Sequence, residues 1–268
     1  MNREAHANGV ITYTFESLTD HPVNAHISTR HGGVSPAPWS SLNMSIARGD
    51  SRERVEENRE RLTAAIGVVS SKLVRCRQVH GTGVAKVDMS DADSWLDGTD
   101  GLVTDTPALP LLLLFADCTP ILLYDPEHHA LGVCHAGWRG TVNGMAAATL
   151  WMMQAAYDTQ PANVIACIGP SIGPESYEVG DDVWSMAHAK LNGPERFFTF
   201  PNGPAAKPYF NLWAANAAQL MEGGVLSTNI EISGIDTAKA TVDFFSHRAE
   251  QGRCGLFTMI AWLTPPTV

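Results

Sequence analysis

The sequence predicts an α+β fold in which helices cover mixed β-sheets, and two observations support that class. Apolar strand-like runs and helix-like runs follow one another without a strict β-α-β alternation. The patterns G-x-G-x-x-G and G-x-x-x-x-G-K-[ST], which are typical of dinucleotide- and phosphate-binding α/β domains, are also missing. Length alone permits one large domain or two small ones, and from the mixing of strands and helices we expect a single domain over residues 1–268.

The first recognisable elements are a loop and a helix. Residues 30–43 hold two glycines, two prolines and three serines, a composition typical of a loop. Asp50 or Ser51 is expected to cap a helix that runs through ERVEENRERLTAAIG and ends at Gly67.

Short apolar runs predict most of the strands that follow. Residues 109–125 are expected to form two strands, LPLLLLF and PILLYD, which are separated by a break at residues 116–119. The other expected strands cover residues 73–79, 84–89, 130–135, 164–168, 228–233 and 256–263. A helix is expected to open at Gly137, Gly140 and Thr141 and to run through VNGMAAATLWMMQAAY, and two more helices are expected near residues 180–190 and 211–222.

Composition excludes several classes of protein. The net charge of −10 argues against a general nucleic-acid binder, which needs a basic face. The start of the chain lacks the apolar core of a signal peptide, and the most apolar run, residues 109–115, is too short to span a bilayer. Five scattered cysteines without a Cys-x-x-Cys pair predict neither a disulfide framework nor a zinc finger. We therefore expect a cytoplasmic protein that does not bind membranes.

Three residues at strand ends are candidate metal ligands. His80 lies in Q-V-H-G-T-G, Cys118 in F-A-D-C-T-P and His135 in C-H-A-G-W-R-G. Two imidazoles and one thiolate leave one tetrahedral position open, which is the pattern of a catalytic zinc site. A cysteine among aliphatic residues is more often part of the core, as we expect for Cys134 and Cys167, so spacing alone leaves both interpretations of Cys118 open.

A second feature is the glycine-rich turn Gly137-Trp138-Arg139-Gly140. A helix that starts after Gly140 would offer free backbone amides to an anion, and Arg139 could bind phosphate beside it. A plain turn with a surface arginine explains the same residues equally well. The expected substrate and phosphate contacts are Arg139, Gly140, Thr141, Asn43 and Arg248, and the expected catalytic residues are Cys118, His135 and Arg139.

The segment A-D-C-T-P-I-L-L-Y-D-P…H-A-G-W-R-G-T resembles the signature of the YfiH-like, or laccase-domain, family. The loop H-G-G-V-S…S-L-N, the helix G-D-S-R-E-R-V-E-E-N-R-E-R-L and the segments Q-V-H-G-T-G-V, T-D-G-L-V-T-D, I-G-P-S-I-G-P-E-S-Y-E-V-G and F-F-S-H-R also occur in the family's order. The resemblance covers nearly the whole chain. It implies an α-β-β-α layered core and one zinc ion bound by His80, Cys118 and His135.

The resemblance also implies an activity. Family members are described as purine nucleoside phosphorylases that act on adenosine, inosine and methylthioadenosine, with adenosine deaminase activity. A purine nucleoside and phosphate are therefore the expected partners. Older descriptions call these proteins multicopper polyphenol oxidases, and some members are linked to the editing of peptidoglycan precursors. This sequence departs from the family pattern at Ala47, where a histidine is frequent, and at His247 and Ala249, where tyrosine and a second arginine are usual.

The residues themselves favour zinc over copper. A trinuclear copper cluster needs many imidazoles, usually in His-x-His pairs, whereas the chain has ten histidines and no such pair. The three ligands could imitate only a mononuclear copper site. The alternative without metal is an amide hydrolase in which Cys118 and His135 form a thiolate–imidazole pair, and a non-catalytic binding module is the third hypothesis.

Overall fold

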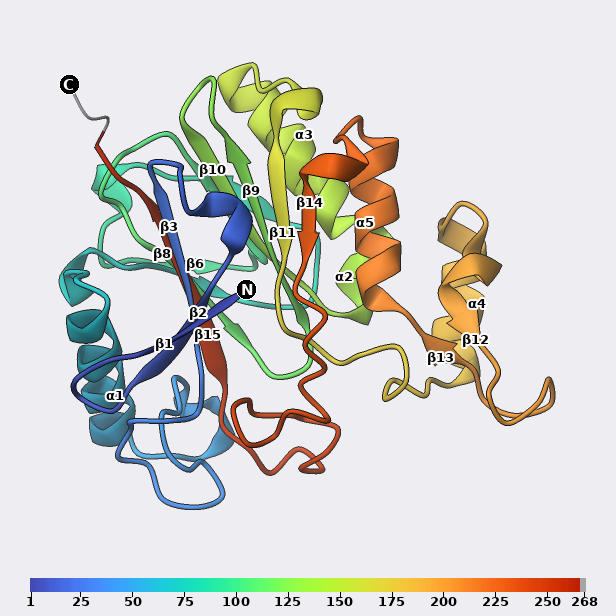
Figure 1. The fold of residues 1–268 in the computed structure, drawn as a ribbon, viewed down its shortest axis with the longest axis horizontal. Coiled ribbons are helices and arrows are strands. Elements are labelled where there is room, and N and C mark those ends of the chain that lie inside the picture. The colour runs from blue at the N-terminus through green and yellow to red at the C-terminus, as the bar shows by residue number, and fades with distance from the viewer. Residues whose placement is uncertain (266–268) are drawn as a thin grey trace.

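The computed structural model describes residues 1–265, and most strands in that range belong to two mixed sheets (Figure 1). In spatial order the first sheet contains β1 (Asn2–Ala5), β2 (Ile11–Thr14), β3 (Val23–Ser28), β15 (Phe257–Leu263), β8 (Leu111–Phe115), β4 (Val74–Arg77) and β6 (Trp95–Asp97). The second contains β14 (Ile230–Ile232), β11 (Ile165–Ile168), β9 (Thr119–Asp125), β10 (Ala130–Ala136), β7 (Gly101–Thr104) and β5 (Val84–Lys86). A separate pair joins β12 (Phe198–Thr199) to β13 (Tyr209–Phe210).

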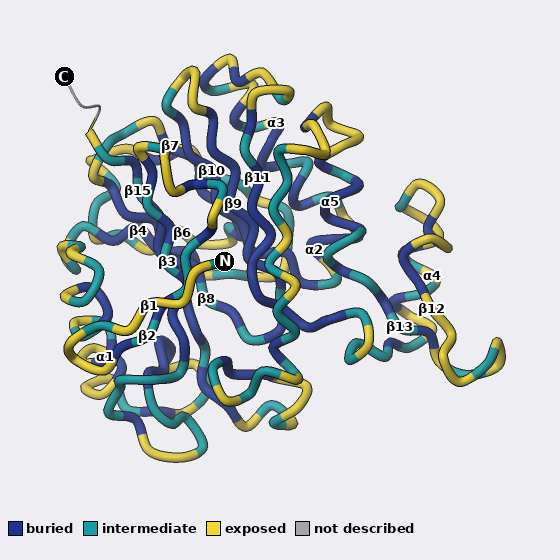
Figure 2. The backbone as a smooth tube through the Cα atoms, in the orientation of Figure 1, coloured by how far each residue is buried: buried dark blue, intermediate teal, exposed yellow. Residues whose placement is uncertain are grey.

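The two sheets pack against each other through apolar side chains. Leu113, Phe115 and Met259 of the first sheet share one buried cluster with Leu122 and Leu131 of the second. Every residue of β9 and β10 is buried, which explains why residues 120–124 and 130–134 are largely apolar rather than alternating (Figure 2). Burial of these side chains stabilises the fold by roughly 25 cal/mol for each Å² of apolar surface removed from water.

Helices pack against strands of both sheets. The helix α3 (Met145–Tyr157) packs on β10, β7 and β5, and its Met153 lies in a cluster with Leu123 of β9. On the first sheet, Leu62 of α1 (Arg52–Ala65) shares a cluster with Ile260 of β15. The remaining helices, α2 (Trp138–Asn143), α4 (Asp181–Lys190) and α5 (Leu212–Glu222), contact one another beside the second sheet. None of the helices in residues 1–265 combines the length and the apolarity needed to cross a bilayer.

The predicted α+β class with mixed sheets is confirmed. The four-layer order and the single domain over residues 1–268 stay predictions, and residues 266–268 lie outside the described range. Ser51 rather than Asp50 caps α1, because its hydroxyl accepts the Arg54 N–H. The sequence analysis did not identify β1, β2, β3, β6 and β7.

The helix predicted after Gly140 is wrong in its start and in its continuity. The helix α2 begins at Trp138 with Gly137 as its N-cap, so Gly140 and Thr141 lie inside it. Gly144 then adopts a left-handed conformation, with φ of 89°, and separates α2 from α3. The glycine permits the break because it has no Cβ to clash at positive φ.

Candidate active site

His80, Cys118 and His135 come together where the two sheets meet. One nitrogen of each imidazole and the Cys118 Sγ all lie within 4.8 Å of one another. His80 follows β4 of the first sheet, and His135 is the second-last residue of β10 in the second. Cys118 occupies the turn by which the chain passes from β8 in the first sheet to β9 in the second. Residues 38 and 17 positions apart thus converge because sheet packing brings three strand ends to one place.

A buried carboxylate that was not predicted from the sequence holds the His135 imidazole and the backbone of the His80 loop. Asp100 is fully buried, and its Oδ1 accepts hydrogen bonds from His135 Nδ1 at 2.9 Å and from the His80 N–H at 3.0 Å. Its Oδ2 accepts the N–H groups of Val79 and Gly81. Since Nδ1 of His135 donates to this carboxylate, Nε2 is left as its metal-binding nitrogen, an arrangement typical of histidine ligands.

Two non-glycine residues beside the site have left-handed backbone conformations. His80 has φ of 60°, and Asp117 has φ of 77°. Such conformations cost free energy and persist where surrounding contacts enforce them. For His80 these contacts are the hydrogen bonds to Asp100. For Asp117 they are bonds that its carboxylate accepts from Thr237 Oγ1, at 2.7 Å, and from the Arg248 N–H, at 2.6 Å. Asp117 therefore holds the Cys118 turn in place, and both of its carboxylate oxygens are engaged.

Gly137 provides the space in which two of the candidate ligands lie. A Cβ at this position would be 2.9 Å from Cys118 Sγ and 3.1 Å from His80 Cδ2. Both distances are shorter than ordinary van der Waals contacts, so a larger residue must displace the ligands.

The Gly137→Ala protein is accordingly expected to bind metal about 5- to 150-fold more weakly, since overpacking of this kind costs about 1–3 kcal/mol. Gly81→Ala is the matched control, because a Cβ there would meet no atom closer than 3.4 Å. Metal affinity measured by chelator competition tests the difference. Equal affinities in the two variants would show that the ligands have room to move.

The charges of the three side chains favour a thiolate. Burial raises the pKa of the Cys118 thiol, but attraction to the His135 imidazolium and hydrogen bonds from His135 and His80 outweigh this effect and bring the pKa down to about 6. Burial likewise lowers the pKa of His135, but the Cys118 thiolate and Asp100 together raise it to about 9. A thiolate is the form of cysteine that binds metal and acts as a nucleophile.

Metal-free protein should react with iodoacetamide at Cys118 before any other cysteine. Burial raises the pKa of Cys76 and Cys134 to about 12 and of Cys254 to about 11, and it also raises that of Cys167. The rate of Cys118 modification should rise as the pH passes through about 6 and level off by pH 8, because only the thiolate reacts. Peptide mass spectrometry measures this rate. A rate that still climbs steeply between pH 8 and 9 would contradict the lowered pKa.

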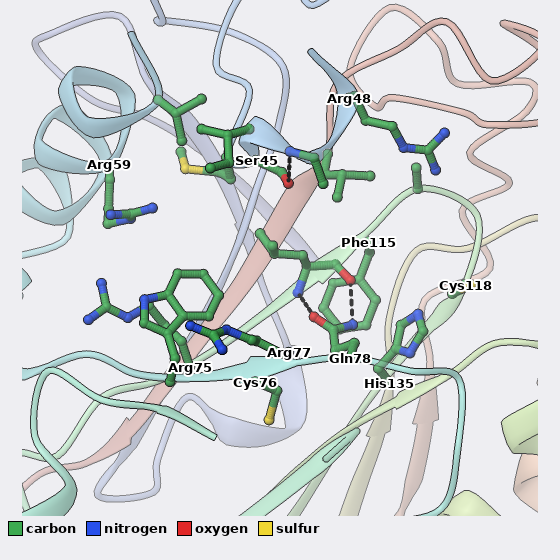
Figure 3. Close-up of a pocket in the computed structure, with 18 of the residues that line it drawn as sticks. Ser45, Arg48, Arg59, Arg75, Cys76, Arg77, Gln78, Phe115, Cys118 and His135 are labelled. Atoms are coloured by element: carbon green, nitrogen blue, oxygen red, sulfur yellow. Dashed lines mark hydrogen bonds between the residues drawn. The ribbon is translucent and has the colours of Figure 1, made fainter. Parts of the chain in front are cut away.

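A cavity of about 680 Å³ opens onto the three candidate ligands. Its volume lies within the range of about 300–1,000 Å³ that is usual for small-molecule sites. Five arginines line it with a single carboxylate, Glu56, which is unexpected in a chain with a net charge of −10; the arginines are Arg48, Arg52, Arg59, Arg75 and Arg77. Figure 3 shows Arg59, Arg75 and Arg77 toward one end of the cavity and Cys118 and His135 toward the other.

Two of the expected anion-binding residues lie outside this cavity. Arg139 is exposed, with its guanidinium 4.2 Å from the centre of the Trp138 ring. Arg248 lies 5.1 Å from the ring centre of Tyr177 and donates to the Glu178 carbonyl oxygen. Neither arginine lines the cavity.

The other expected contacts have internal partners. Thr141 is fully buried, and its hydroxyl donates to the Ala136 carbonyl oxygen and accepts from Asn216. Asn43 is also fully buried, and its side-chain amide bonds to Asp50 and to backbone groups of the surrounding loops. Gly140 is buried within α2. These internal contacts show that the three residues support the scaffold, and their role as substrate contacts stays a prediction.

The departures from the family pattern lie close together. Ala47 lines the cavity, and the neighbouring Arg48 bonds to Nδ1 of His247 at 3.1 Å. The Arg48 guanidinium also donates to the Gly252 carbonyl oxygen. Ala249 lies in the same C-terminal segment, where its N–H donates to Ser246 Oγ. Of the three departures only Ala47 lines the cavity, and His247 reaches it through Arg48, so the three candidate ligands are left in place.

A second group of potential ligands lies on the first sheet. Single atoms of Glu4, His6 and His26 lie within 4.8 Å of one another. Thr12 Oγ1 already contacts both imidazoles, and His26 stacks on Trp262. These contacts explain the two histidines as parts of the sheet surface.

Comparisons with known proteins show a family that spans most of the chain. Residues 24–264 match the family model described as multi-copper polyphenol oxidoreductase laccase. The chain is 37% identical to the purine nucleoside phosphorylase YlmD of Geobacillus stearothermophilus over 238 residues, which cover 86% of each chain. It is 34% identical to a purine nucleoside phosphorylase of Bacteroides thetaiotaomicron over 242 residues, which cover 87% of this chain and 89% of that protein.

Solved structures show the same fold. The crystal structure of YlmD from Geobacillus stearothermophilus superposes with a TM-score of 0.91 at 32% sequence identity, over 98% of this chain and 99% of that chain. The crystal structure of the hypothetical protein YfiH from Bacillus licheniformis gives a TM-score of 0.90 at 30% identity, with the same coverage.

Proposed function

Because the chain belongs to the multi-copper polyphenol oxidoreductase laccase family, and its relatives carry the name purine nucleoside phosphorylase, we propose that it is a zinc-dependent purine nucleoside phosphorylase. Its substrates are adenosine, inosine and methylthioadenosine, and the same site deaminates adenosine. The observation that carries the proposal is that His80, Cys118 and His135 converge at one end of a cavity lined with arginines.

The donor set fits zinc. Two imidazole nitrogens and a sulfur of lowered pKa form three of the four positions of a tetrahedral site, and the Asp100 carboxylate fixes one imidazole from behind. All three ligand residues line the cavity, so the fourth position is accessible to a substrate or a water molecule. When bound, zinc supplies a Lewis acid and lowers the pKa of a coordinated water to about 7.

The chain's own residues account for binding and charge stabilisation. The cavity holds a nucleoside next to the three ligands, and its guanidinium groups neutralise an anionic co-substrate. In phosphorolysis the phosphate oxygen forms a bond to C1′ of the ribose while the bond from C1′ to the purine nitrogen breaks. The purine leaves with the electron pair of that bond and takes up a proton. Asp117 does not supply this proton, because both of its oxygens are engaged in holding the Cys118 turn.

A second candidate function rests on the Cys118–His135–Asp100 series. Cys118 is the nucleophile of lowered pKa, His135 the adjacent base, and Asp100 the group that orients the base. This order of groups is found in metal-independent hydrolases, and it would attack an amide such as one in a peptidoglycan precursor. A mononuclear copper site on the same ligands would instead support oxidation of a polyphenol.

Metal analysis paired with a phosphate-dependence assay separates these functions. We expect about one zinc per chain by atomic absorption, with copper near zero, and release of hypoxanthine from inosine only when phosphate is present. Zinc-free protein that hydrolyses amides would establish the second candidate. Copper at one per chain with polyphenol oxidation would establish the oxidase. Zinc-loaded protein that releases no base would favour the third hypothesis, a non-catalytic binding module.

A further inference from the structure

The arginine-rich end of the cavity has no role in holding the candidate metal ligands. Arg59 projects from α1, and Arg75 and Arg77 belong to β4, so two elements supply the arginines at this end. Figure 3 shows the three side chains grouped on the side of the cavity away from Cys118 and His135. We call this group the arginine wall.

Two members of the arginine wall have carboxylate partners. Arg75 is 8% exposed, pairs with Asp93, and lies 5.0 Å from the ring centre of Trp95, which fixes its guanidinium. Arg77 bonds to Asp97 at 2.8 Å, but both side chains are mostly exposed, and such surface pairs contribute little.

Arg59 differs from both. In the described range, residues 1–265, its guanidinium has no hydrogen-bond partner and no carboxylate within 4.0 Å. Burial and the nearby positive charge of Arg75 lower the pKa of Arg59. An arginine that serves packing alone usually reaches water or an internal acceptor with its five N–H groups. Here a partly buried guanidinium instead faces a cavity beside a second one, and although Glu56 and Asp93 attract it from a distance, neither forms an ion pair with it.

A phosphoryl group is the ligand whose charge and shape suit the guanidinium groups of Arg59 and Arg75. A planar carboxylate satisfies one guanidinium through two parallel bonds, whereas a tetrahedral dianion can accept from two or more guanidinium groups at different angles. The cavity connects the arginine wall with the candidate metal ligands, so one bound substrate complex could occupy both.

We propose that the arginine wall is the phosphoryl-binding subsite of this enzyme, with Arg59 as its principal contact. The proposal rests on the proposed function for the identity of the nucleoside but not for the anion. The phosphoryl group has two potential sources: inorganic phosphate as the co-substrate, or a phosphate ester carried by the nucleoside itself. Either source places the anion in the cavity rather than beside Arg139.

The test compares Arg59→Gln with the wild-type protein. Titration calorimetry with inorganic phosphate and with inosine 5′-monophosphate measures binding without turnover, and steady-state assays give KM for phosphate with inosine. Loss of charged hydrogen bonds predicts that Arg59→Gln binds the relevant phosphoryl ligand about 10- to 100-fold more weakly. Zinc content and inosine affinity should not change. Arg61→Gln is the matched control, because Arg61 lies on the same helix, pairs with Glu57 and does not line the cavity.

The source of the phosphoryl group follows from which ligand is affected. Weaker phosphate binding and a raised KM for phosphate identify the co-substrate, whereas weaker binding of inosine 5′-monophosphate with unchanged phosphate binding identifies the ester. Arg59→Lys, which keeps the charge, should show a smaller loss and guards against a folding defect in Arg59→Gln. Failure of the proposed function appears separately, as absence of phosphorolysis in wild-type protein that still binds the anion.

Two results would overturn the subsite. One is unchanged binding of both phosphoryl ligands in Arg59→Gln and Arg59→Lys. The other is loss of phosphate binding in Arg139→Gln while Arg59→Gln binds normally, which would place the anion beside Arg139, outside the cavity.

Discussion

The Cys118→Ala protein is expected to lose both its zinc and its phosphorolytic activity. The substitution leaves two imidazoles, which rarely hold zinc, and it removes the thiolate that balances the charge of the ion. We expect metal content below about a tenth of the wild-type value, because each lost ligand weakens binding by more than one factor of ten. Atomic absorption after dialysis, together with hypoxanthine release from inosine, measures both effects.

Cys134→Ala is the matched control for this experiment. Cys134 lies one residue before His135 in β10, but it is fully buried in the cluster beneath α3. Its replacement creates a small cavity and lowers the free energy of unfolding without touching the candidate ligands. Zinc retained by Cys118→Ala at the wild-type level would refute the ligand assignment.

The ligand residues could be predicted because their environment is visible in local sequence. Cys118 stands at a break between two apolar strands, and His80 and His135 lie next to glycine-rich turns. What spacing could not supply was the convergence of the three, which depends on packing between the two sheets. The resemblance to a family supplied it instead.

The arginine wall could not be predicted either, because it also depends on packing between elements distant in sequence. Arg59 lies in the run E-E-N-R-E-R, where alternating charges are typical of a solvated helix face. The position of α1 over the cavity turns Arg59 toward it, whereas Arg61 two residues later forms a surface pair with Glu57. Likewise, the anion site was predicted beside Arg139 because a helix was expected to begin after Gly140. The helix α2 begins earlier, at Trp138, and Gly140 and Thr141 are buried within it.

The N-terminal strands could not be predicted because their sequences lack the apolar patterns that are typical of strands. All four residues of β1 are exposed, and β2 and β3 contain polar residues at inner positions, with Thr12 fully buried. Their pairing is set by neighbours distant in sequence, since β3 lies between β2 and the C-terminal strand β15. Intrinsic strand propensity is a weak guide when pairing is decided by such contacts.

Asp100 is the residue whose role depends most on long-range contacts, and its replacement tests whether the metal site is preorganised. In Asp100→Asn an amide NH₂ replaces one carboxylate oxygen, so a donor faces the donors of His135 and of the His80 loop. We expect metal affinity to fall about 10- to 100-fold, as for other groups that orient a histidine ligand. We also expect the free energy of unfolding to fall by about 3 kcal/mol, because buried donors lose their acceptor.

Asp125→Asn separates positioning from stability. Asp125 is fully buried, like Asp100, and accepts bonds from the His128 imidazole and from backbone N–H groups, but it lies at the opposite end of β9 from Cys118. Both variants should unfold at lower denaturant concentration, whereas only Asp100→Asn should lose metal affinity in chelator competition. If the two variants lose stability equally and both keep wild-type metal affinity, Asp100 supports the loop alone, and the imidazoles are oriented by the packing of β10 against β7 and β9.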